Sequence, residues 1–168
     1  MTVTIEGGGK LQAFLDKFKF QKARVDAGFF PEAKYKDGTQ VAQVAIWLED
    51  GTEKNGKEFI LPRPFLLPTF NEQKEKWKKK FFDIIQNQNE IDVKKALFAV
   101  GRLAQDDIRD KIDWWAESGT PRNAEATIKI KSGERYGEKE ESGRSVGDSP
   151  LIWSGHMRDS VAFKVTEK

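Results

Sequence analysis

The chain has 168 residues, a length that suits one domain built around one hydrophobic core. Its 29 basic residues are nearly balanced by 27 acidic ones, which argues against a general DNA-coating protein, because such a protein needs a clustered basic excess. The absence of cysteine excludes disulfides, thiolate metal sites and a cysteine nucleophile, and no stretch approaches the roughly 18 apolar residues of a membrane span.

The first part of the chain predicts a helix, a strand and a second helix. Apolar residues recur at helical spacing over Leu11–Phe18, and they alternate with polar residues over Lys22–Phe29, which predicts a strand. The turn signal Asp37-Gly38 separates this strand from a second helix over Thr39–Glu49, and the Thr39 side chain is the expected N-terminal cap of that helix.

The middle of the chain predicts a tight turn and two long helices. Segment Glu53–Glu58 contains Asn55-Gly56 and indicates a hairpin tip or a mobile loop. A lysine-rich helix is expected over Asn71–Gln86. A longer one follows over Ile91–Trp115, where apolar residues three or four positions apart form one stripe that we expect to be buried.

The last part of the chain combines a polar segment with a final strand. Segment Lys131–Ser149 is rich in glycine and charge, so we expect it to be mobile in the isolated protein. A turn at Ser154-Gly155 leads into an alternating segment around Val161–Val165, which is typical of a half-buried strand. The predicted fold class is α+β: a small, mostly antiparallel sheet packed with two or three longer helices in a single domain over residues 1–168.

Patterns typical of catalysis or metal binding are missing from the sequence. The one histidine, His156, stands beside a turn without a recognisable nucleophile or orienting carboxylate. The aspartates of the long helix have no coordinating companion at a known metal-ligand spacing: Asp106, Asp107 and Asp110. We therefore expect no catalytic residue, no cofactor and no bound metal.

Three motifs occur in order along the chain. The first runs from Gly28-Phe29-Phe30-Pro31 through the stretch Tyr35–Thr52, with its Gly-Thr, Val-Ala, Glu and second Gly-Thr pieces. The second is Pro62-Arg63-Pro64-Phe65-Leu66, and the third is Pro150-Leu151-Ile152-Trp153-Ser154-Gly155-His156-Met157-Arg158-Asp159-Ser160-Val161. Together these motifs cover most of the chain, and they resemble the tail-completion, or head–tail joining, proteins of long-tailed bacteriophages and prophages. Conservative departures are Ser154 in place of the common threonine and Met157 in place of leucine.

The resemblance implies a structural virion protein rather than an enzyme. Such a subunit would assemble into a ring at the neck or tail end, in the host cell cytoplasm, and would be monomeric in isolation if its self-contacts are weak. Its implied partners are further copies of itself, the tail tube protein and the head connector or head-closure protein, with no membrane contact. A tail terminator or another minor tail subunit is the alternative within this class.

Aromatic and basic residues of the motifs are candidates for the subunit interface. Phe65 is expected to anchor the second motif in the core, while Arg63 beside it pairs with a carboxylate such as Glu49 or stays solvated. Adjacent tryptophans on a helix face about 100° apart, so both cannot enter one core and one is expected at an interface. The interface candidates are Arg63, Phe65, Trp114, Tyr136 and Trp153.

Two other classes of function compete with this reading. A nucleic-acid-binding module would use the lysine run Lys74–Lys80, which otherwise forms a solvated helix face. A small hydrolase or toxin would depend on His156.

Overall fold

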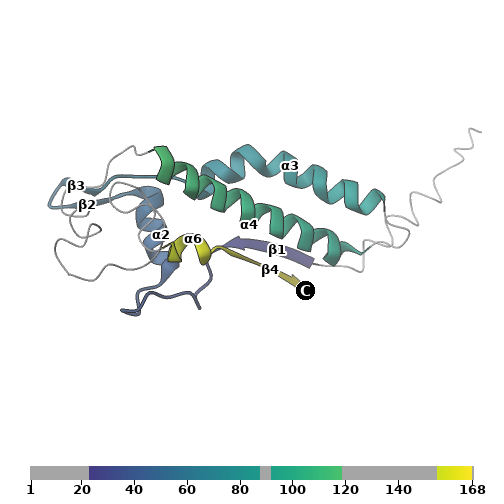
Figure 1. The fold of residues 1–168 in the computed structure, drawn as a ribbon, viewed down its shortest axis with the longest axis horizontal. Coiled ribbons are helices and arrows are strands. Elements are labelled where there is room, and N and C mark those ends of the chain that lie inside the picture. Colours follow the sequence, from purple (N-terminus) through teal and green to yellow (C-terminus); the bar gives the residue numbers. More distant parts are fainter. Residues whose placement is uncertain (1–22, 88–91, 119–154, 168) are drawn as a thin grey trace, which may run out of the picture.

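The computed structural model describes residues 23–87, 92–118 and 155–167 (Figure 1). The predicted helix at Leu11–Phe18 and the segment Lys131–Ser149 lie outside these residues. The elements, in chain order, are β1 (Ala23–Gly28), α2 (Val41–Asp50), β2 (Thr52–Lys54), β3 (Lys57–Ile60), α3 (Leu66–Gln86), α4 (Val93–Ser118), α6 (His156–Asp159) and β4 (Ala162–Glu167). Helices pack against a small antiparallel sheet, which confirms the predicted α+β class.

The main sheet joins the first and last described strands. β1 pairs antiparallel with β4, and Val25 lies opposite Val165 in the register. The face that carries Val25 and Phe163 packs on α4 at Gly101, where an added Cβ would come within 2.4 Å of the Phe163 ring and 2.8 Å of Val25. A glycine is therefore needed at this position, because a larger residue would push the sheet away from the helix.

Helix α4 lies between α3 and the β1–β4 sheet (Figure 1). Its predicted apolar stripe is confirmed, since Val100, Ala104, Ile108 and Ile112 are all buried. The indole nitrogen of Trp77 on α3 donates to Asp107 on α4 at 2.7 Å, and two lysine–carboxylate pairs also cross between the helices.

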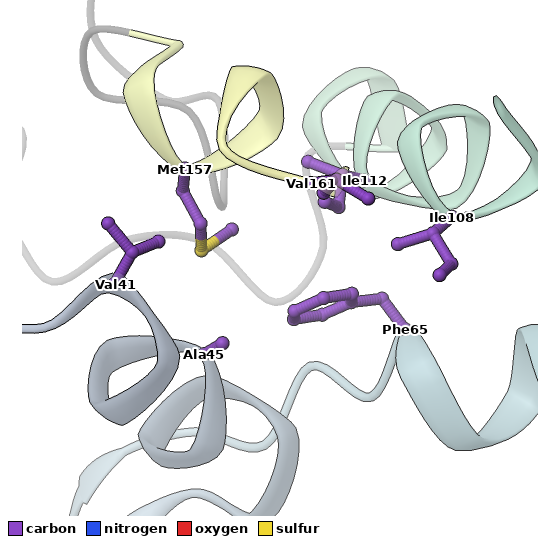
Figure 2. Close-up of a cluster of buried hydrophobic side chains, with 7 residues drawn as sticks. All are labelled: Val41, Ala45, Phe65, Ile108, Ile112, Met157 and Val161. Carbon is purple, nitrogen blue, oxygen red and sulfur yellow. The ribbon is translucent and has the colours of Figure 1, made fainter. Parts of the chain in front are cut away.

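The larger of the two described core clusters joins α2, α4 and α6 with the residues just before α3 and β4 (Figure 2). The side chains point toward one another from elements that are distant in sequence: Val41 and Ala45 of α2, Phe65 at the start of α3, Ile108 and Ile112 of α4, Met157 of α6, and Val161. A second cluster, formed by Ile85, Val93 and Ala96, lies where α3 finishes and α4 begins.

The β2–β3 hairpin follows α2 directly. Asn55 and Gly56 form its turn with φ angles of 56° and 70°, which are the left-handed values of a type I′ turn. The sequence is compatible with a hairpin tip or a mobile loop over Glu53–Glu58, and the structure shows the hairpin.

Two predicted helix starts are wrong. Helix α3 begins at Leu66, five residues before the predicted Asn71. Pro68 lies in its first turn, where proline is tolerated because the N–H that it lacks would have no partner inside the helix. Helix α2 begins after Gln40 with no side-chain cap, so Thr39 does not cap it. The Thr39 N–H donates instead to Asp37 at 2.9 Å, which closes a local turn and lowers the pKa of the Asp37 carboxyl.

Candidate interaction surface

The structure separates the predicted interface residues into a buried and an exposed group. Arg63 and Phe65 are 6% and 0% exposed, so neither presents a surface to another subunit. Trp114 is 53% exposed, whereas its neighbour Trp115 is half-buried and donates its indole N–H to the Pro64 carbonyl at 2.8 Å. Tyr136 and Trp153 lie outside the described residues.

A carboxylate at the end of α2 caps the start of α3. Glu49 accepts hydrogen bonds from the backbone N–H groups of Phe65, Leu66 and Leu67, at 2.7, 2.9 and 2.9 Å. A negative charge at this position satisfies donors that have no partner inside the helix and interacts favourably with the positive end of the helix dipole. Glu49 thus caps α3 and forms no ion pair with Arg63, so the expected pair between them is wrong; the solvated alternative for Arg63 is wrong as well, because Arg63 is buried.

Arg63 is held inside the same junction. Its backbone N–H donates to the Leu48 carbonyl at 2.6 Å, which ties the chain between β3 and α3 to the last turn of α2. Burial lowers the pKa of its guanidinium from the ordinary value, since the charged form loses contact with water.

The described part of the third motif, residues 155–161, is bound to α4 by polar side chains. Gln105 and Arg109 donate to the Val161 carbonyl at 2.6 and 2.9 Å, and Arg109 also reaches the Arg158 and Asp159 carbonyls. One turn further along α4, Asp113 accepts from the Arg158 Nε at 2.6 Å, and this hydrogen bond raises the pKa of Arg158. These contacts fix α6 and the start of β4 against the helix.

His156 has contacts that orient its ring at the surface. Its Nε2 lies 3.0 Å from the Lys34 carbonyl, and the ring packs edge-on against Tyr35 with 5.1 Å between centroids. The Ser160 hydroxyl donates to the backbone carbonyl of His156, not to its ring, so these two side chains do not form a nucleophile–base pair. Within the described ranges, no group of three or more metal-ligating side chains is present.

Large apolar side chains remain exposed on α2, on and just after β3, and at the start of α3. Five of them lie in this part of the chain, at 38–65% exposure: Ile46, Trp47, Phe59, Leu61 and Leu67. Sequence reasoning missed this group, although Ile46 and Trp47 fall outside the buried stripe of α2 and were the available signal. Large exposed apolar side chains are candidates for contacts with another protein when they lie in one patch. We call these five residues the apolar end.

The lysine run of α3 does not form one basic face. Residues from Lys74 to Lys80 point in different directions because each helical residue turns by about 100°. Two of these lysines are also paired, Lys76 with Asp107 and Lys78 with Glu75. These pairs offset part of the positive charge of the run, and binding of nucleic acid by this helix stays a prediction.

Comparisons with known proteins do not add a relative to these observations. No family model matches the chain, and no curated protein or solved structure matches it significantly. In the described part of the chain, no helix is both long and apolar enough to cross a membrane.

Proposed function

We propose that the chain is a structural protein of a tailed-phage virion that completes the tail or joins it to the head. In this proposal it acts by assembly, with copies forming a ring at the neck or tail end. A tail terminator is the nearest alternative, because it would also be a small α+β subunit of a ring at the tail.

The apolar end is the observation that carries the proposal. Trp47 is 40% exposed and Phe59 is 65% exposed. Contact between apolar side chains and water is unfavourable, because the transfer of apolar surface out of water lowers the free energy of the system. A protein that functions by docking to neighbours has a reason to retain such a surface, and burying it would drive the association.

The motifs that resemble the tail-completion family have a structural role here. Glu49 caps α3, Phe65 and Met157 fill the core, and Arg158 anchors α6 to α4. The motif residues therefore join elements that are distant in sequence, which is the role expected of residues that define a shared fold. The packing roles of the motif residues support the proposal, because they are the roles expected in a fold shared with that family. The apolar end supports it separately, as a surface that a neighbouring protein could cover.

The test is capture of the purified chain by phage tails that lack this protein. The chain is first examined by size-exclusion chromatography with light scattering across a concentration series, and then incubated with such tails and with filled heads. We expect capture at tail ends, with restored head attachment if the chain is the completion protein. Restored tail length control without head attachment would identify a terminator instead.

A matched pair of variants assigns the contact. Trp47→Ser combined with Phe59→Ser removes exposed apolar surface from the apolar end and should abolish capture. Phe82→Ser removes a side chain of similar exposure (55%) from the last part of α3 and should leave capture unchanged. A chain that stays monomeric and ignores both tails and heads would contradict the proposal.

A further inference from the structure

The solvent-facing side of α4 carries an ordered pattern of charge. Most of its exposed residues advance by three or four positions and therefore share one face of the helix, whereas Lys94, which pairs with Glu167, and Ser118 are exposed outside this spacing. In chain order the residues on this face are Lys95, Phe98, Arg102, Asp106, Asp110, Trp114 and Glu117. We call this set the α4 stripe.

The stripe changes sign at its midpoint. Its first half contains two cations around the 58%-exposed Phe98, and its second half contains anions around the 53%-exposed Trp114. The first turn of α4 has no acidic residue and the last turn no basic one. This polarity is opposite to the one that the helix dipole favours, so helix stability does not explain it.

Contacts inside the chain do not explain the central charges either. In the described ranges neither Arg102 nor Asp110 takes part in an ion pair, although α4 uses Asp107 and Lys111 in pairs with α3 and Asp113 with α6. Arg102 and Asp110 are therefore available to a partner. Phe98 packs edge-on against Phe163, and Trp114 packs against Trp115 and lies under the Lys111 ammonium, but more than half of each of these two aromatic residues stays exposed.

The pattern is self-complementary when a second copy of the helix runs antiparallel. Positions 102 and 110 are equally distant from Asp106, and so are positions 98 and 114. A two-fold axis beside Asp106 would place each Arg102 opposite the other chain's Asp110, and each Phe98 near the other chain's Trp114. Lys95 and Glu117 extend the same complementarity at the two outer ends.

Helix geometry permits this contact. Residues four apart form a ridge inclined to the helix axis, and two such ridges pack when helices cross at roughly −50°. Positions 98 and 114 each lie about 12 Å along the helix from position 106, at 1.5 Å per residue. A crossing at this angle therefore brings the two inclined stripes together over several turns.

We propose that the α4 stripe is a homodimer interface, in which two copies of this chain pair antiparallel about Asp106. The interface is isologous and closes with two copies, so it does not generate a ring and does not rest on the proposed function. Because the contact involves mainly one helix face, the dimer is weak, with dissociation in the micromolar range. The two Asp106 carboxylates face each other at the axis and oppose association.

Charge reversal provides the test, with sedimentation velocity from micromolar to near-millimolar protein at low and high salt. The wild-type chain should dimerise, more weakly at high salt. Arg102→Asp and Asp110→Arg should each weaken the dimer more than about tenfold, because each creates two like-charged contacts. Mixing these two variants should restore dimers, since both contacts of the mixed pair are then oppositely charged.

Controls separate this contact from general charge effects and from misfolding. Lys79→Asp and Asp83→Arg reverse exposed charges on α3 and should leave dimerisation unchanged, while Asp106→Asn should strengthen it. Circular dichroism checks that each variant is folded. A wild-type chain that remains monomeric throughout, or an assembly that survives Arg102→Asp unchanged, overturns the proposal, as does a mixture of the two variants that stays monomeric.

Discussion

Where α3 begins and α4 finishes, seven buried side chains from five segments meet, and Glu49 and Asp113 add polar contacts between elements. Where α3 finishes and α4 begins, the described cluster contains three buried side chains, all from these two helices. The first end thus assembles segments that are distant in sequence, whereas the second mainly closes a helix pair. We expect topology and stability to depend more on the first end.

The largest effect is expected from Phe65→Ala at the first end. Phe65 is fully buried and its ring packs edge-on against Phe29, so truncation leaves a cavity between α2, α4 and α6. The free energy of unfolding should fall by about 4 kcal/mol. Urea denaturation measures this loss. A smaller loss for Phe65→Ala than for Ile85→Ala at the second end would contradict the comparison of the two ends.

A smaller loss is expected from Ile85→Ala at the second end. Ile85 is 2% exposed, but among the described residues its cluster contains three buried side chains, against seven at the first end, so we expect it to adjust more easily. The free energy of unfolding should fall by about 3 kcal/mol. The same urea titration applies, and crossing this variant with Phe65→Ala tests additivity, which is expected for sites this far apart.

Glu49→Gln sharpens the comparison by changing polar contacts alone. The amide keeps the shape of the side chain but loses the charge and one acceptor oxygen, so the cap of α3 weakens by about 1.5 kcal/mol. Asp50→Asn is the matched control, because it removes an exposed charge from the next residue. Equal effects of the two substitutions on urea unfolding would show that capping is unimportant.

The smallest effect concerns Tyr35, beside the first end. Burial, and secondarily the charge of Asp37, raises the pKa of its phenol, so the folded chain favours the neutral form. The associated stability is fully present below the unfolded pKa of about 10 and is lost as the pH rises through the folded value. Phenolate absorbance of a Tyr136→Phe variant measures this pKa directly, and titration at the ordinary value would contradict the burial of Tyr35.

Surface function was harder to predict than secondary structure. Adjacent helical residues face about 100° apart, so one of Trp114 and Trp115 is expected to be exposed, and Trp114 is. In contrast, Arg63 and Phe65 are interface candidates because a motif contains them, yet both are buried; the expected anchoring of Phe65 in the core is confirmed. A motif identifies residues that matter without distinguishing a packing role from a binding role, since burial depends on the whole fold.

The spacing of apolar residues along the sequence is sufficient to predict β1, α2, α4 and β4. Alternation in strands and helical periodicity in helices show which side of each element is apolar. Tertiary structure alone decided that β1 pairs with β4, that α3 begins before Pro68, and that Glu49 caps it. These features depend on contacts between residues far apart in the chain: 16 positions separate Glu49 from Phe65, and the sheet joins the two ends of the described chain. Such contacts leave no periodic signal in a single sequence, so only the folded arrangement shows them.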